Sequence, residues 1–350
     1  MQETVDNTPS GIVIKQKDLR IITPFFDIRL SQDGGIEYIK DPRDDRFISK
    51  QGSFASFFEG TIGGKKIQSS GRWVIQQLSE SAPFVTAREY GFIADIPYQF
   101  EIKIHEDNPV IECYVQFDFN GQKIGLLSDD LRDSHSPFIH EEKLRFKFFP
   151  EMSDDAAGIR DLPFVIAETA DKYVEGNYWT AVSDGQYGLA FFNKGNMGSI
   201  RESDGSFSIP LAYSMYYIWG TRILNGTYSF EFAIYPFVGD WQTAGLHRKA
   251  LEYNFPLPYM EEVPGNGRLG NQVDILNVEA DNLVLSALYS SDSKIFARFY
   301  EYKGSAAIVK INTSKKTTGI TEVDLDGNSK AEVFGRDIFS PHQIKTYMIK

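Results

Sequence analysis

Apolar and polar residues alternate with a period of two through much of this chain, and this feature most limits its fold. Phe100, Ile102 and Ile104 point to one side of an extended segment, and the charged residues between them point to the other. The alternation resumes over residues 111–119, after the turn-forming residues 106–109. The pattern predicts antiparallel hairpins with one buried face.

The same pattern recurs along the chain. Residues 26–39 predict a second hairpin, in which Gly34 and Gly35 can take positive φ angles at the turn. Residues 177–195, "NYWTAVSDGQYGLAFFNKG", predict a third, which turns at Asp184-Gly185. Aromatic residues make up 14% of the chain, and aromatics favour strands.

One helix is predicted, in residues 240–255, where Leu246 and Ala250 lie four positions apart. Pro256 and Pro258 end it. The next residues are rich in Pro, Gly and Asn, and short strands follow. We therefore predict an all-β chain with a large β domain over residues 1–260, a linker over 261–272 and a small β-sandwich over 273–350.

Composition limits the partners. The net charge of −12 argues against nucleic acid, whose phosphates need basic patches. No apolar run approaches the roughly 20 residues that span a bilayer, and the first residues lack a signal-peptide core. We therefore expect no membrane partner and a cytoplasmic location. Cys113 is the one cysteine, so no intrachain disulfide forms, and its strand position predicts a buried core thiol.

The densest polar segment is residues 127–146, "LSDDLRDSHSPFIHEEKLRF". Asp133, His135 and His140 are its candidate ligands for a metal of mixed oxygen and nitrogen coordination. The alternative is a solvated loop, because a lone His-x4-His spacing is a weak metal signal. Loops that carry such residues also serve to contact partners.

No pair of acidic residues predicts a catalytic dyad. Two carboxyl groups that act together on one bond must lie close to each other, whereas adjacent strand residues point to opposite faces. Asp44-Asp45, Asp154-Asp155 and Glu261-Glu262 are adjacent pairs of this kind. His105-Glu106-Asp107 precedes Asn-Pro and predicts a turn. We therefore predict no catalytic residue and no metal or other cofactor bound by this chain.

Several motifs in order resemble the C-terminal part of glycoside hydrolase family 38 α-mannosidases. "VSDGQYGLAFFN" (182–193) is similar to the family's "vsDGdyGvallN", and "FEFAIYPFVGDW" (230–241) to its "F.yaLyPh.GdW". "LVLSALYSSDSKIFARFYEYKGSAAIVKI" (283–311) and "SPHQIKTYMI" (340–349) resemble its small terminal domain. Together with the hairpin at 26–39, the resemblance covers nearly the whole chain.

The resemblance implies a galactose-mutarotase-like supersandwich followed by a small β-sandwich. In the family, an N-terminal barrel carries an Asp nucleophile and a divalent metal, usually zinc, and hydrolyses α-mannosides. This chain resembles the β part that follows the barrel. The resemblance therefore predicts a chain that is inactive alone, with a catalytic barrel domain or subunit and a carbohydrate as partners.

Four residues are the candidates for a carbohydrate rim: Asp184, Tyr187, Trp179 and Trp241. Asp184 has the alternative of a turn corner, and the tryptophans that of core packing. The family usually has His where this chain has Tyr228 and Phe237. This departure weakens the transfer of polar rim contacts from the family.

Two other functions stay open. A free-standing carbohydrate-binding protein would bind sugar through exposed aromatic rings. An independent mutarotase-type enzyme would need a His and an acid in one cleft, and His135, His140 and Glu142 are the candidates. The sequence leaves open whether the chain forms a homo-oligomer.

Overall fold

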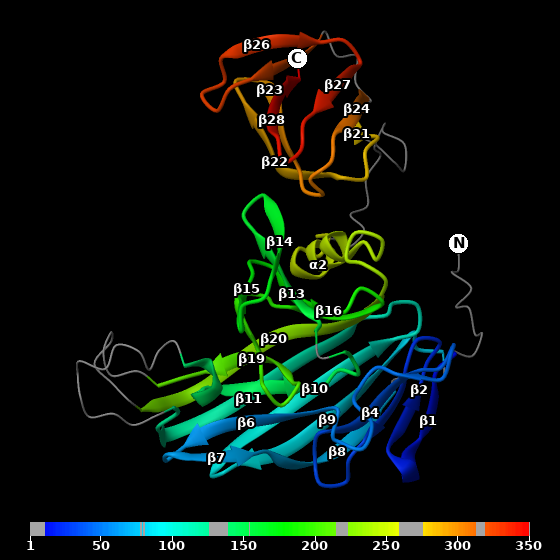
Figure 1. Ribbon diagram of the computed structural model, residues 1–350, viewed down its shortest axis with the longest axis vertical. Coiled ribbons are helices and arrows are strands. Elements are labelled where there is room, and N and C mark those ends of the chain that lie inside the picture. Colours follow the sequence, from blue (N-terminus) through cyan, green and yellow to red (C-terminus); the bar gives the residue numbers. More distant parts are fainter. Residues whose placement is uncertain are drawn as a thin grey trace, which may run out of the picture. The chain divides into compact units, whose positions relative to one another are not determined.

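The computed structural model describes residues 11–77, 79, 81–125, 139–153, 155–214, 223–258, 276–312 and 319–349. The chain divides into two compact units. Unit 1 is drawn from Met1–Asp161 and Glu168–Pro256, and unit 2 from Leu162–Ala167 and Leu257–Lys350. Strands dominate both units (Figure 1), which confirms the predicted all-β class.

Two antiparallel sheets form unit 1. The first contains β1 (Val13–Lys15), β2 (Arg20–Ile22), β3 (Asp27–Leu30), β4 (Ile36–Asp41), β5 (Arg46–Phe47), β6 (Ser56–Ile62), β7 (Lys65–Gln68), β12 (Leu144–Phe148), β15 (Tyr173–Glu175), β18 (Gly198–Arg201) and β19 (Phe207–Ala212). Its described strands follow the order β1-β2-β3-β4-β6-β12-β19-β18-β15, with β5 paired to β4 and β7 to β6. A short 3-10 helix, η1 (Gln16–Asp18), separates β1 from β2.

The second sheet contains β8 (Ser70–Gln76), β9 (Phe84–Ile93), β10 (Ile96–His105), β11 (Ile111–Gln122), β13 (Ala157–Leu162), β14 (Val165–Thr169), β16 (Trp179–Ser183), β17 (Tyr187–Phe192) and β20 (Leu224–Val238). Among the described residues, its order is β14-β13-β16-β17-β20-β11-β10-β9-β8. The end of β13 and the start of β14 fall within Leu162–Ala167, which is counted with unit 2. The predicted hairpin of residues 100–119 is β10 and β11, paired from Tyr98–Phe117 to Ile104–Ile111.

The core of unit 1 lies between these sheets. Phe58 of β6 packs edge-to-face on Phe100 of β10, with ring centroids 5.0 Å apart, and on Phe117 of β11, at 5.5 Å. Phe146 of β12 contacts Phe232 of β20 at 5.0 Å. Burying rings of this size stabilises each by roughly 1.5–3 kcal/mol relative to exposure. The period-two pattern therefore identified the buried faces of β10 and β11 correctly.

The local predictions are also confirmed. Gly34 and Gly35 have φ angles of +100° and +72° at the turn between β3 and β4. The predicted helix is α2 (Leu246–Asn254), which buries Leu246 and Ala250. Cys113 is a buried free thiol, and burial raises its pKa. No helix in the described ranges is long and apolar enough to cross a membrane.

Unit 2 is the predicted small sandwich. Its sheets are built from β21 (Asn277–Val278), β24 (Ala307–Asn312) and β27 (Arg336–Phe339), and from β22 (Leu283–Ser291), β23 (Lys294–Glu301), β28 (Ile344–Ile349), β25 (Ile320–Val323) and β26 (Ser329–Val333). Phe299, Val309, Phe339 and Tyr347 share its core. The predicted linker 261–272 lies outside the described residues, so the domain boundaries stay a prediction.

Candidate functional site

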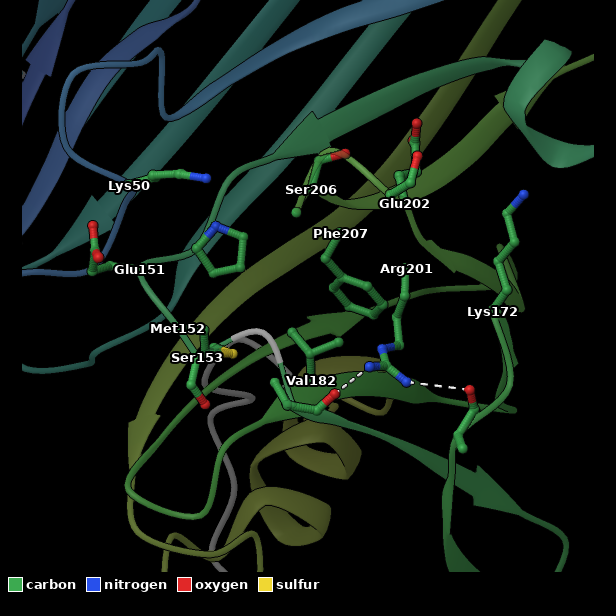
Figure 2. Close-up of a pocket in the computed structure, with 15 residues that line it drawn as sticks. Lys50, Glu151, Met152, Ser153, Lys172, Val182, Arg201, Glu202, Ser206 and Phe207 are labelled. Carbon is green, nitrogen blue, oxygen red and sulfur yellow. Dashed lines mark hydrogen bonds between the residues drawn. The ribbon is translucent and has the colours of Figure 1, made fainter.

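A cleft of about 620 Å³ opens on unit 1 (Figure 2). Lys50, which follows β5, and Pro150–Ser153, which follow β12, line one part of it. Lys172, just before β15, lines another part, together with residues 201–203 and 205–207 from the end of β18 to the start of β19. Val182 of β16 adds apolar surface. The volume lies within the roughly 300–1,000 Å³ typical of ligand pockets.

A buried ion network holds the β18–β19 turn that lines this cleft. Arg145 of β12 is fully buried and donates to Glu202 of that turn at 2.9 Å and to Glu59 of β6 at 2.6 Å. Lys147, two residues along β12, donates to Asp204 at 2.7 Å and to Glu202 at 3.1 Å. Two cations on one face of β12 therefore hold the β18–β19 turn in place.

Opposite charges keep these carboxyl groups ionised despite burial. Burial opposes ionisation of Glu202, but the hydrogen bond and charge of Arg145 lower its pKa below the usual range. Burial also opposes ionisation of Asp204, but hydrogen bonds from Lys147 and Ser206 lower its pKa to about 2. Glu202 and Asp204 are therefore ionised near neutral pH. The charge of Glu202 is neutralised by Arg145 and Lys147.

Two other cations of the cleft are not neutralised in this way. The Arg201 guanidinium donates to the backbone carbonyls of Ala156 and Ala170, contacts drawn in Figure 2. Neither Arg201 nor Lys50 has a carboxylate partner among the described residues. Lys172 differs, because its ammonium pairs with Glu141.

Asp184, a predicted rim residue, lies beside the cleft and forms the corner of its turn. Its carboxylate accepts the backbone N–H groups of Gln186 at 2.9 Å, Tyr187 at 2.8 Å and Ser153 at 3.4 Å. Partial burial opposes ionisation, but these N–H groups lower the pKa of Asp184. Ser153 lines the cleft, so Asp184 positions one of its walls.

Tyr187, the second rim candidate, is half-buried, and its ring is covered by a cation. The Arg46 guanidinium lies 3.9 Å from the ring centroid. Such stacking is favourable and fixes both side chains. Neither Asp184 nor Tyr187 lines the cleft itself, and their role at a sugar rim stays a prediction.

The two tryptophan candidates lie in the core. Trp179 is fully buried, Trp241 is 8% exposed, and their ring centroids are 6.4 Å apart. Trp179 Nε1 donates to His247 Nδ1 of α2 at 3.1 Å. This packing matches the core alternative for both tryptophans, and their role at a sugar rim stays a prediction.

Asp161 lies next to the hydrogen-bonded pair of Trp179 and His247, with its Oδ1 3.9 Å from His247 Nδ1. Burial raises the pKa of Asp161 to about 7, although the Tyr178 N–H opposes the shift. Burial lowers the pKa of His247 to about 4. Burial therefore favours the neutral forms of Asp161 and His247. These two residues belong to the core around Trp179 and do not line the cleft.

The metal candidates are only partly described. Asp133 and His135 lie outside the described residues. His140, in η3 (His140–Glu142), is buried and packs on Tyr173 with ring centroids 5.0 Å apart. Burial and the charge of Lys143 lower the pKa of His140 to about 4, so its imidazole is neutral near pH 7. In the described part of the chain, no three His, Cys, Asp or Glu side chains are grouped as a metal site.

Three residues of the cleft were missed from the sequence: Lys50, Glu151 and Arg201. They come from separate loops and strand ends, and no local spacing links them. The buried ion network is visible in the sequence, because Arg145 and Lys147 interrupt an otherwise apolar strand.

A family model matches the small sandwich of unit 2. Residues 282–347 match the profile described as "Glycosyl hydrolases family 38 C-terminal beta sandwich domain". This match confirms the family 38 resemblance. No curated protein matches this chain in sequence.

Two solved structures have the same fold as nearly the whole chain. One is an alpha-mannosidase from Enterococcus faecalis V583, with a TM-score of 0.74 at 10% identity, over 98% of this chain and 43% of that one. The other is a glycosyl hydrolase family 38 protein from Enterococcus faecalis, with a TM-score of 0.76 at 10% identity, over 98% and 45%. This chain thus spans less than half the length of these two structures.

Proposed function

We propose that this chain is the β-sandwich portion of a family 38-type α-mannosidase. A barrel domain or subunit supplies the nucleophile and a divalent metal, which is zinc by family resemblance. The β portion braces that barrel and helps to shape the rim of the sugar site. One observation supports this most directly: a family 38 terminal sandwich at 282–347 completes a fold that superposes on an alpha-mannosidase over 98% of this chain.

An exposed apolar face of unit 1 suits such a partner. Val74 of β8 and Tyr90 and Phe92 of β9 are 46%, 50% and 56% exposed. Strand alternation places them on the face opposite the core, at the β8 edge of the second sheet. Exposed apolar patches of this kind are typical of interaction surfaces. We expect the barrel to cover them.

The test combines the purified chain with a family 38 catalytic barrel and an aryl α-mannoside, with zinc or cobalt present. We expect no turnover by the chain alone, co-elution with the barrel, and faster turnover by the complex than by the barrel. The double variant Tyr90→Ser/Phe92→Ser should weaken co-elution. Val13→Ser, at a 51% exposed position on β1, is the matched control and should not.

Two results would contradict this function. Metal-dependent turnover by the chain alone, lost in Asp133→Asn or His135→Ala, would place an active site in the polar loop. A failure to associate with the barrel, together with tight sugar binding by the chain alone, would favour the free-standing carbohydrate-binding protein.

A further inference from the structure

The cleft of unit 1 offers both hydrogen-bond donors and a hydrogen-bond acceptor around apolar surface. Lys50, after β5, and Glu151, after β12, lie on one side of the cleft, and Arg201 of β18 lies on the other (Figure 2). Met152, Val182 and Phe207 supply apolar lining. Pockets that bind small molecules combine apolar walls with a few placed polar groups in this manner.

The accessible charges of the cleft are of both signs. Glu202 is neutralised by Arg145 and Lys147, and Lys172 by Glu141. Among the described residues that line the cleft, the positive groups left are Lys50 and Arg201, and the negative group left is Glu151, whose carboxylate accepts the Gln51 N–H at 3.0 Å. Each terminal nitrogen of Arg201 donates to one carbonyl and keeps one N–H group for a ligand. A dianion such as phosphate would be repelled by the Glu151 carboxylate, whereas a neutral ligand would not.

A neutral polyol fits this mixture better. Each hydroxyl group both donates and accepts, so Glu151 can accept from one and Lys50 and Arg201 can donate to others. The apolar C–H faces of sugar rings can pack on Met152 and Val182. We propose that this cleft binds a short neutral oligosaccharide, with Lys50, Glu151 and Arg201 as its polar contacts. That the sugar is an α-mannoside rests on the proposed function.

The experiment is titration of the whole chain with an α-linked mannotriose, followed by calorimetry and by saturation-transfer NMR, with maltotriose in parallel. We expect saturable binding with a Kd on the order of 1 mM or below for mannotriose. Lys50→Met and Glu151→Gln should each weaken it at least about fivefold, because each leaves sugar hydroxyls without partners. Lys50→Arg should retain most of the affinity.

Lys65→Met, at an exposed position on β7, is the matched control and should bind like the parent chain. Circular dichroism must show that every variant is folded. The absence of saturable binding to either trisaccharide overturns the proposal, as does binding that Lys50→Met and Glu151→Gln leave unchanged. Saturable binding of inorganic phosphate in place of sugar, with the same response to the variants, also overturns it.

The outcome is separable from that of the proposed function. If the barrel associates and turnover rises while the chain binds no sugar, the proposed function stands and the cleft proposal fails. If maltotriose binds as mannotriose does and the cleft variants weaken both, the cleft is confirmed as a saccharide site and its restriction to α-mannosides fails.

Discussion

The carboxyl groups of Glu202 and Asp161 are both almost fully buried in unit 1, yet they ionise differently. Glu202 lies between Arg145 and Lys147, and its pKa falls below the usual range. Asp161 has a neutral His247 nearby, and burial raises its pKa to about 7. Burial alone therefore does not set the charge of a group, because a nearby cation can outweigh the loss of solvation. The charged cluster of Arg145, Lys147 and Glu202 supports a turn that lines the cleft. The neutral pair of Asp161 and His247 lies where α2 packs on the core.

Removal of Arg145 should disturb this contrast most. Arg145→Met leaves Glu59 and Glu202 buried with Lys147 as their remaining cation, which should lower the free energy of unfolding by about 3–5 kcal/mol. Urea unfolding followed by tryptophan fluorescence measures this, because all four tryptophans belong to the sequence ranges of unit 1. A loss below about 1 kcal/mol would show that the network does not hold the β18–β19 turn.

The neutral cluster predicts a pH dependence. A raised pKa in the folded state means that Asp161 lowers stability as pH rises from 3.8 to about 7. The lowered pKa of His247 means that stability is lost as pH falls from 6.5 to about 4. In the parent chain these two slopes oppose each other and largely cancel between pH 4 and 6.5.

Asp161→Asn removes the loss of stability with rising pH and leaves the opposite dependence caused by His247. The variant should gain on the order of 2–4 kcal/mol at pH 8, and its stability should rise with pH between 4 and 6.5. His247→Gln should show the reverse slope, with stability falling from pH 4 to 7. Urea midpoints measured across pH 4–8 check both. Identical profiles for the parent and the two variants would mean that neither group titrates with a shifted pKa.

A smaller effect is expected at Asp184, where a low pKa occurs at a partly exposed turn. Asp184→Ala removes the acceptor for the N–H groups of Tyr187 and Ser153 and should cost about 1 kcal/mol. Asp184→Asn keeps one acceptor oxygen and should lose less. The same unfolding measurement applies, and equal losses for the two variants would contradict the turn-corner role.

The smallest effect is expected at an exposed ion pair. Arg29 and Glu37 pair at 3.2 Å on β3 and β4, with side chains 48% and 46% exposed. Arg29→Met should change the free energy of unfolding by less than about 1 kcal/mol, since water and salt screen such pairs. This variant calibrates Arg145→Met, and a comparable loss at both sites would remove the distinction between buried and exposed pairs.

Much of the fold could be predicted from the sequence. Alternation over residues 100–104 and 111–119 predicted β10 and β11 with the correct buried faces. Spacing of Leu246 and Ala250 predicted α2, and Gly34-Gly35 predicted a turn. These features depend on neighbours within a few positions, so they are legible in one sequence.

The candidate site could be predicted only in part. Asp184 was identified, and it supports the cleft through Ser153 without lining it. Lys50, Glu151 and Arg201 come from segments about 50 to 150 positions apart, and only sheet pairing brings them together. Trp179 was a candidate for stacking on sugar, and the partner that makes it a core residue, His247, lies far along the chain.

Strands, turns and the helix can be located from the sequence alone, because periodicity and turn chemistry act over a few residues. The small sandwich was also identifiable, through its family motifs. Only the tertiary structure decided which charged side chains are buried and which groups ionise. Those outcomes depend on solvent exclusion and on opposite charges from distant strands, as Arg145 with Glu59 and Glu202 demonstrates.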